Sequence, residues 1–284
     1  MITQQLTELL GDEITNLQFL SSGQIGHIYK AQLADQAVVI KTMPETKRDD
    51  LLIEARMLQD LSEKGLRVPK VIASHKDLLV LEYIEPCRDI SYDQEIEAAK
   101  ALASLHQVSN ENRMYGYYYD TTIASFTQKN EQTQYNWALF LGQMRILPMA
   151  KICYDKGDLN KSHMERLEIL CSSLHRRMDM SLITPSLLHG DVWSGNVIYA
   201  KEGICFIDPA IYFGDREMEL AFILLFHTFG STFFKHYTNV HLLSEDFYKT
   251  KVPLYQIYPL LVHVALYGGG YVRELEERLQ RLKV

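Results

Sequence analysis

The hydrophobic period of this chain alternates over roughly the first 85 residues and then becomes mainly helical, and this change restricts the possible folds more than any other feature. Before that point, most apolar residues lie in short runs rich in β-branched residues, as is typical of strands, with one helical stretch between them. After Pro86 they recur mainly at spacings of three and four, as is typical of helices. The pattern predicts an α+β chain with a small sheet-rich lobe over residues 1–85 and a larger, mostly helical lobe over residues 86–284.

The small lobe is expected to hold several strands and one main helix. The strand candidates lie in residues 17–33 (two strands around a Gly-containing turn), 37–43, 71–75 and 78–83. Apolar residues at three- and four-residue spacing from Leu51 to Leu61 mark the helix, which also carries Glu54. In the large lobe, a helix face runs from Ile96 to His106, and only residues 186–208 interrupt the helical pattern.

Composition excludes several classes of function. The formal net charge of -7 argues against broad nucleic-acid binding, which needs clustered Lys and Arg. The longest apolar run, residues 220–226, is far shorter than the roughly 20 residues of a membrane span. The N-terminal residues lack the pattern of a secretory signal, so a cytoplasmic protein is expected. The four cysteines are widely spaced and form no metal-binding pattern, which predicts reduced, structural thiols. The oligomeric state stays open.

A polar turn with several reactive side chains follows a short apolar run, in the sequence LHGDVWSGN at residues 188–196. Asp191 in this turn is suited to accept the proton of an attacking hydroxyl in phosphoryl transfer. Asn196 follows five residues later, the spacing at which protein kinases place a magnesium-binding Asn. Asp208 follows an apolar strand over residues 204–207 and is a candidate second magnesium ligand. The oxygen-bearing side chains, without sulfur, favour a magnesium–nucleotide site over a zinc site.

Each of these residues also has a plainer interpretation. Asp191 and Asn196 are common turn-forming residues, and His189 beside them is interpreted as a structural hydrogen-bonding residue rather than a base. Lys41 lies in the apolar strand VVIKT, where a charge needs a partner, and Glu54 on the following helix is the natural one. Alternatively, Lys41 points outward from an edge strand. The joint presence of five charged or amide groups, Lys41, Glu54, Asp191, Asn196 and Asp208, favours the catalytic interpretation.

Three weaker signals complete the candidate site. Gly23 and Gly26, in SSGQIGHIY, allow a hairpin backbone to approach phosphates, although an ordinary hairpin also explains them. Backbone groups around Glu82 and Ile84, between the lobes, are candidates to bind an adenine edge, or they are simply the end of a strand. Trp193 either stacks on a sugar or anchors its own loop.

Three segments of the chain resemble the fructosamine kinase (ketosamine-3-kinase) family, a branch of the aminoglycoside phosphotransferase-like kinases. They are LLHGDVWSGNVIYAKEGICFIDPAIYFGDREMELA, GYYYDTTIASFTQKN and LYQIYPLLVHVALYGGGY. The resemblance implies a two-lobed protein-kinase-like fold and the ATP-dependent phosphorylation of a ketosamine, the adduct of a sugar and an amine, at its 3-hydroxyl.

The resemblance also implies roles for single residues. It makes Asp191 the catalytic base, Asn196 and Asp208 the magnesium ligands, Lys41 the phosphate-contacting lysine, Glu54 its ion-pair partner, and Trp193 a border of the sugar pocket. Glu219 stands where the family commonly has Asp, so its contact with the catalytic turn is expected to be longer. Three alternatives stay open: a kinase of another small alcohol (an aminoglycoside, choline or a thiosugar), a nucleotide-binding pseudokinase, and, among ketosamines, either a fructosamine or a ribulosamine, free or protein-bound.

Overall fold

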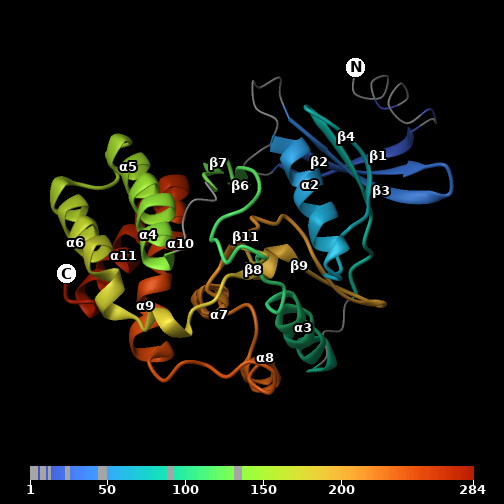
Figure 1. Cartoon of the computed structure of the whole chain (residues 1–284). Coiled ribbons are helices and arrows are strands. Elements are labelled where there is room, and N and C mark those ends of the chain that lie inside the picture. Colours follow the sequence, from blue (N-terminus) through green and yellow to red (C-terminus); the bar gives the residue numbers. More distant parts are fainter. Residues whose placement is uncertain are drawn as a thin grey trace.

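A computed structural model of the chain describes residues 6, 11, 14–22, 26–43, 50–87, 92–130 and 136–284. Within these residues, a five-stranded antiparallel sheet forms one part of the molecule and helices dominate the other (Figure 1). This is the α+β architecture that the change in hydrophobic period predicts. The predicted domain boundary between residues 85 and 86 falls between the last strand of the sheet and the next helix, and it stays a prediction.

The N-terminal part confirms the expected strands and main helix. Its elements are β1 (Ile14–Ser22), β2 (His27–Leu33), β3 (Gln36–Thr42), α2 (Asp50–Glu63), β4 (Val71–His75) and β5 (Leu78–Glu82). The strands lie in the order β1-β2-β3-β5-β4, so β3 is the central strand. On β3, Lys41 is paired with Ile28 of β2 on one side and with Leu79 of β5 on the other.

The two faces of this sheet belong to different hydrophobic cores. On β5, Leu79 and Leu81 join the core that contains α2, whereas Leu78 and Val80 join a separate cluster on the opposite face. This alternation follows from the two-residue period of a strand. Because Lys41 is paired with Leu79, its side chain lies on the face of the sheet that is covered by α2.

The C-terminal part is built from helices and short hairpins. Its helices are α3 (Tyr92–Leu105), α4 (Trp137–Phe140), α5 (Leu147–Asp155), α6 (Lys161–Arg177), α7 (Arg216–Leu225), α8 (Ser231–Tyr237), α9 (Val252–Tyr255), α10 (Ile257–Tyr267) and α11 (Gly270–Arg281). π-helical turns occur at Leu141–Ile146 and Phe247–Lys251, and 3-10 turns at Met180–Leu182 and Ser194–Asn196. The strands are β6 (Thr121–Ile123), β7 (Phe126–Gln128), β8 (Ser186–Leu188), β9 (Val197–Ala200), β10 (Gly203–Phe206) and β11 (Tyr212–Gly214).

Three of the short pairings differ in how well the sequence predicts them. The β9–β10 hairpin lies within residues 186–208, where the sequence interrupts the helical pattern. The β6–β7 hairpin and the strand β11, which pairs with β8, were not predicted. Each of these strands has only three residues, which is too short to show a two-residue period.

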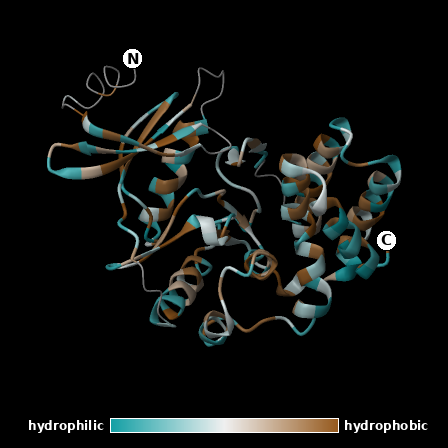
Figure 2. Cartoon of the chain, turned by 180° about the vertical axis from the view of Figure 1, so that it is seen from behind, coloured by the Kyte–Doolittle hydropathy of each residue, from teal (hydrophilic) through white to brown (hydrophobic). Residues whose placement is uncertain are grey.

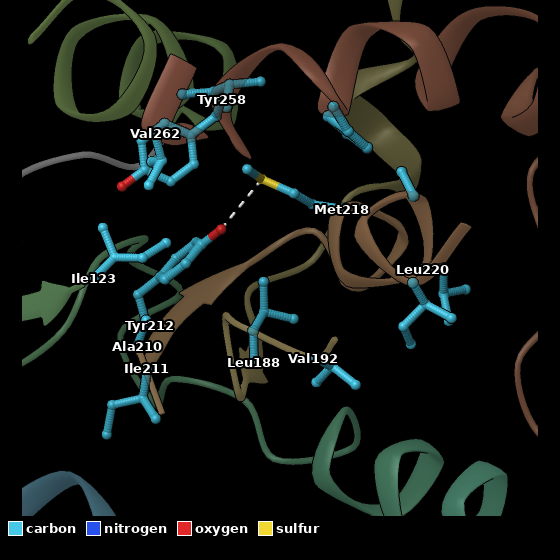
Figure 3. Close-up of a cluster of buried hydrophobic side chains, with 14 of the residues drawn as sticks. Ile123, Leu188, Val192, Ala210, Ile211, Tyr212, Met218, Leu220, Tyr258 and Val262 are labelled. Carbon is cyan, nitrogen blue, oxygen red and sulfur yellow. Dashed lines mark hydrogen bonds between the residues drawn. The ribbon is translucent and has the colours of Figure 1, made fainter. Parts of the chain in front are cut away.

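Buried side chains from distant segments meet behind the turn at residues 189–196. Figure 3 shows Ile123, Leu188, Tyr212 and Tyr258 gathered in this cluster, where the Tyr212 hydroxyl donates to the sulfur of Met218 at 3.2 Å. Figure 2 shows the hydrophobic residues concentrated where helices and strands pack together. Among the helices of the described residues, none has the length and apolarity needed to cross a membrane.

Candidate active site

The β9–β10 hairpin explains why an Asn and an Asp twelve residues apart come together. Val197 at the start of β9 is paired with Phe206 at the end of β10, so the residues just outside this pair lie at the same end of the hairpin. The backbone confirms this, because Ile207 N–H donates to the Asn196 carbonyl at 3.0 Å. Asn196 and Asp208 therefore both reach the wall of one cavity.

The turn that carries Asp191 is tied to the segment that carries Asp208. Ala210 N–H donates to the carbonyl of His189 at 2.8 Å, directly beside Gly190. Gly190 has a φ of +87°, and a Cβ atom there would lie 2.1 Å from the Ala210 carbonyl oxygen. Only glycine fits this position, because both the left-handed backbone and the close approach exclude a side chain.

His189 is structural, as the sequence predicts. Its side chain is fully buried, and its Nδ1 accepts a hydrogen bond from the backbone N–H of Asp191 at 3.3 Å. Burial lowers the pKa of His189, although the carboxylates of Glu219 and Asp208 oppose this. The ring therefore stays neutral near pH 7 and holds the turn from behind.

Lys41 joins the two parts of the molecule. Its Nζ donates to Glu54 Oε1 of α2 at 2.6 Å and also to Oδ1 of Asp208. Burial on its own would lower the pKa of Lys41, but the two carboxylates raise it above the ordinary value, so the ammonium is charged. The edge-strand alternative is wrong, because β3 is central and the Lys41 side chain is only 14% exposed.

Asp191 and Asn196 contact each other inside the turn. The Asn196 Nδ2 group donates to Asp191 Oδ2 at 2.8 Å and to the Asp191 carbonyl at 3.0 Å. The turn-forming interpretation thus describes part of what these residues do, yet both also line the cavity. Burial and the nearby carboxylates of Asp208 and Glu219 raise the pKa of Asp191 to about 8, against the opposing hydrogen bond from Asn196. The result is a carboxylate more basic than usual.

Glu219 supports the turn from α7, and the expected longer contact is wrong. Its Oε1 accepts from the Gly190 N–H at 2.6 Å, while its Oε2 accepts from His106 Nε2 at 2.8 Å and from the His189 N–H at 3.3 Å. The side chain of Glu219 is longer than that of Asp, yet its contact with the Gly190 N–H is short, and its second oxygen reaches His106, which follows α3. Tyr237 of α8 bonds the other ring nitrogen of His106 at 2.6 Å and completes the support.

A cavity of about 520 Å³ lies between the sheet and the helical part. Its lining includes five polar residues that the hydrogen bonds above bring together, and this part is called the polar end: Lys41, Glu54, Asp191, Asn196 and Asp208. The lining also includes a group of apolar and aromatic residues, called the apolar end: Ile123, Ala124, Phe222, Pro259, Val262, His263, Leu266 and Tyr267. This volume falls within the range typical of small-molecule sites.

Of the glycines and the strand-end residues proposed to contact the nucleotide, only Gly26 is found at the cavity among the described residues. Gly26 lines the cavity, and a Cβ atom there would lie 1.8 Å from the Thr42 carbonyl oxygen; Gly23 lies outside the described residues. Neither Glu82 nor Ile84 is among the lining residues, and the Glu82 N–H already donates to the Lys70 carbonyl at 2.9 Å. Their contact with adenine stays a prediction.

Trp193 lines the cavity, and 42% of its surface is exposed. Its ring also lies so close to Gly195 that a Cβ atom there would come within 2.3 Å of the indole. Both interpretations of Trp193 therefore fit its position: it packs on its own loop and presents a face to the cavity.

Sequence reasoning missed the residues of the apolar end. Pro259, Val262, His263, Leu266 and Tyr267 recur at three- and four-residue spacing on α10, so they form one face of that helix. The spacing was readable, but α10 is apolar nearly all round, and a helix of this kind does not reveal which face borders a cavity.

The two-part fold, with a lysine–glutamate pair on the sheet side and an Asp, Asn and Asp on the helical side, defines a protein of the kinase-like class. Solved structures agree on the fold. The aminoglycoside phosphotransferase APH(4)-Ia superposes with a TM-score of 0.67 at 13% identity, covering 99% of this chain and 96% of that one. A provisionally named fructosamine-3-kinase of Thermobifida fusca gives a TM-score of 0.88 at 29% identity, covering 100% and 99%.

The chain belongs to the fructosamine kinase family, whose profile it matches over residues 1–284. Curated relatives agree. It is 30% identical over 287 residues to a "Probable ketoamine kinase", YniA, of Escherichia coli strain K12, covering 99% of this chain and 98% of the relative. It is also 30% identical over 263 residues to a protein of the same description from Enterococcus faecium, covering 91% and 92%.

Proposed function

We propose that this protein is an ATP-dependent kinase that phosphorylates the 3-hydroxyl of a ketosamine, a fructosamine or a ribulosamine. The family and the names of the relatives support this substrate class. The observation that carries the proposal is the position of Lys41, which bonds Glu54 and Asp208 at the wall of a cavity that Asp191 also lines. The cytoplasmic location expected from the sequence is part of the proposal.

The polar end of the cavity is the proposed nucleotide end. Lys41 is a fixed positive charge there, and it is suited to contact the α- and β-phosphates of ATP. The close approach of Gly26 to Thr42 keeps the start of β2 near this end. Backbone N–H groups of a glycine-containing segment can bind phosphate oxygens, which is the proposed role of Gly26.

The proposed magnesium ligands are Asn196 and Asp208. Their chemistry fits, because magnesium prefers oxygen donors and takes few protein ligands when phosphates supply the others. Asn196 donates its amide N–H groups to Asp191, which leaves its Oδ1 oxygen for a cation. A bound magnesium ion supplies positive charge to the transferred phosphoryl group.

Asp191 is the proposed catalytic base. As the 3-hydroxyl oxygen forms its bond to the γ-phosphorus, the hydroxyl proton passes to the Asp191 carboxylate, and the bond from phosphorus to the oxygen bridging to the β-phosphate breaks, releasing ADP. The hydrogen bond from Asn196 to Oδ2 fixes the orientation of the carboxylate. The environment that raises the pKa of Asp191 to about 8 increases its affinity for the proton.

The apolar end is the proposed acceptor end. The amine of a ketosamine is cationic near neutral pH, and it is two carbon atoms from the carbon that bears the 3-hydroxyl. It must therefore lie near Asp191 when that hydroxyl is in place. Trp193 follows Asp191 by two residues and also lines the cavity, so its exposed indole is suited to contact the sugar or the cationic amine.

The test is a coupled assay of ADP release with MgATP over four acceptors: fructosyl-lysine and ribulosyl-lysine, each free and protein-bound. Aminoglycosides, choline and a thiosugar serve as the competing acceptors. We expect turnover with at least one ketosamine and a product phosphorylated at O3 by nuclear magnetic resonance. Turnover with an antibiotic, choline or the thiosugar, and none with a ketosamine, would refute the proposed substrate class.

A matched pair of variants tests the role of Asp191. Asp191→Asn should lower kcat by at least about a thousandfold while MgATP still raises the thermal stability of the protein. Asp155→Asn, an exposed helix residue paired with Lys151, should leave kcat unchanged. If the wild-type protein binds MgATP but turns over no acceptor, the pseudokinase alternative replaces the proposal.

A further inference from the structure

Helix α2 packs on two sides: on strands β4 and β5 of the sheet, and on strand β6 of the C-terminal part. Its buried residues Leu51, Ala55, Leu58 and Leu61 lie in the same hydrophobic core as the large-lobe helices. The core on the opposite face of the sheet is separate and contains no α2 residue among those described. In Figure 1, α2 lies between the sheet and the strand β6. The position of Glu54 on α2 is therefore set partly by the helical part.

A carboxylate in the last turn of α2, that of Asp60, makes polar contacts with the C-terminal part. Asp60 Oδ2 accepts hydrogen bonds from the hydroxyls of Tyr119 at 2.6 Å and of Tyr117 at 3.0 Å. Burial and the bonds to Asp60 raise the pKa of both tyrosines, so both stay donors. An acidic residue near the C-terminus of a helix is unfavourable for the helix itself, because it adds negative charge at the negative end of the helix dipole. The two hydroxyls offset that cost.

One further contact strengthens the same junction. The guanidinium of Arg56, one turn before Asp60 on α2, lies 3.8 Å from the centre of the Tyr119 ring. This cation–π contact places Tyr119 between two side chains of the helix.

The tyrosine segment is in turn fixed to the frame of the active site. Gly116 and Phe213 exchange two backbone hydrogen bonds, of 3.0 and 2.8 Å, and the ring of Tyr117 stacks on that of Phe213 at 5.7 Å. Phe213 lies in β11, five residues after Asp208, and β11 pairs with β8, which leads into the turn of Asp191. The contacts from Asp60 thus connect α2 to the strands that hold Asp191 and Asp208.

We propose that Asp60, Tyr117 and Tyr119 form a positioning clamp that holds α2 where Glu54 can pair with Lys41. Glu54 and Asp60 are six residues apart, or about 9 Å along one helix, so a displacement of α2 at Asp60 also moves Glu54. The clamp acts through Glu54 and Lys41, and it touches neither nucleotide nor acceptor. This inference rests on the proposed function, in which Lys41 contacts the phosphates of ATP.

Three consecutive tyrosines supply a matched control. Tyr117 and Tyr119 bond Asp60, whereas the Tyr118 between them is 58% exposed, and its hydroxyl has no hydrogen-bond partner within the described residues. Tyr→Phe at each position keeps the ring and removes only the hydroxyl. We expect the double variant Tyr117→Phe/Tyr119→Phe to lower kcat/KM for MgATP by about tenfold, less than the hundredfold that a misplacement of 1 Å can cost. The KM for the acceptor and all constants of Tyr118→Phe should stay at the wild-type values.

Combination with Glu54→Gln separates positioning from general stability. If the clamp acts through Glu54, the double Tyr→Phe change should lower kcat/KM for MgATP by less than about twofold in the Glu54→Gln background. Urea unfolding should be measured for four proteins: wild type, Tyr117→Phe/Tyr119→Phe, Glu54→Gln and the combination of all three changes. The losses in free energy of unfolding at the two sites should add, since Glu54 and the tyrosines share no hydrogen bond. A full tenfold loss in the Glu54→Gln background, or no loss in the wild-type background, overturns the clamp.

Calorimetric titration with MgATP distinguishes failure of the clamp from failure of the proposed function. If the wild-type protein phosphorylates no acceptor, the proposed function fails, but the same four proteins still report the clamp through the dissociation constant of MgATP. The clamp predicts a larger dissociation constant of MgATP in the double Tyr→Phe variant, and little further increase when Glu54→Gln is added. Absence of any MgATP binding by the wild-type protein overturns both proposals.

Discussion

Replacing Glu219 with Gln keeps the shape of the side chain and removes its charge, so it tests the support of the catalytic turn directly. The carboxylate accepts three hydrogen bonds: Gly190 N–H on Oε1, and His106 Nε2 with His189 N–H on Oε2. Glutamine offers only one oxygen. His106 can change tautomer, because Tyr237 bonds its other nitrogen, but a backbone N–H has no such freedom. In either orientation of the amide, at least one backbone N–H of the turn loses its acceptor.

The size of the effect follows from this count. A buried donor without a partner costs about 1–3 kcal/mol, and the remaining hydrogen bonds weaken because a neutral oxygen replaces a charged one. We expect the free energy of unfolding to fall by about 2–4 kcal/mol. The turn also carries Asp191, so kcat should fall by about ten- to a hundredfold, as expected for a displacement of less than 1 Å.

The stability effect should depend on pH with a defined sign. Burial alone would raise the pKa of Glu219, but His106, His189 and the Gly190 N–H together hold it below the ordinary value of 4.5. A carboxylate with a lowered pKa in the folded state contributes its full stabilisation above that ordinary value and loses it as pH falls through the folded pKa. The difference between wild type and Glu219→Gln should thus be largest near neutral pH and shrink below pH 4.5.

Urea unfolding followed by circular dichroism, together with steady-state kinetics, measures both effects. Glu245→Gln is the control, because this side chain is exposed and the same charge is removed. If Glu219→Gln unfolds like the control and keeps its kcat, then Glu219 does not hold the turn, and the hydrogen bonds described above do not carry the proposed energy.

Three further outcomes are expected. Gly26→Ala should raise the KM for ATP by about three- to tenfold in steady-state kinetics, because the new Cβ would meet the Thr42 carbonyl oxygen at 1.8 Å and must move the backbone at the start of β2. An unchanged KM would show that Gly26 does not help to bind ATP. Lys251→Met should lower the free energy of unfolding by about 3–5 kcal/mol in urea, because it leaves Glu217, 2.7 Å from Lys251 Nζ, buried without its ion-pair partner; a loss below 1 kcal/mol would contradict this. The midpoint of thermal unfolding should fall as pH drops below 6.5. Burial lowers the pKa of His189 in the folded protein, so the unfolded chain binds the proton first as pH falls. A His189→Gln variant should show a smaller fall.

The sequence was most informative where short-range geometry decides the structure. Asn196 and Asp208 flank a hairpin whose two strands are four residues each, so their meeting at one end follows from local pairing. The charge of Lys41 in an apolar strand likewise indicated a buried partner, and Glu54 lay on the next element. These inferences needed only the period of the strands and the cost of an unpaired charge.

Contacts between distant segments could not be predicted in this way. Asp60 and Tyr119 are 59 residues apart, and each is ordinary in its own segment, since Asp is common on helix surfaces and a run of tyrosines fits packing. The support of Glu219 by His106 spans 113 residues, and the resemblance to the family led to the wrong expectation of a longer contact. Such pairs depend on how helices pack, which side-chain periodicity alone does not fix.

The two ends of the cavity differ in what holds them, and this explains why the motif around Asp191 does not identify an acceptor. The polar end is fixed by backbone pairings, such as the bond from Ala210 N–H to the His189 carbonyl, that allow little variation in residue type. The apolar end is formed by one face of α10 and by the β6–β7 turn, where packing tolerates exchanges of similar volume. Substitutions there change the shape offered to an acceptor without disturbing the nucleotide end. The choice among sugar-amines should therefore follow Val262, His263 and Leu266 of α10 rather than the turn that carries the chemistry.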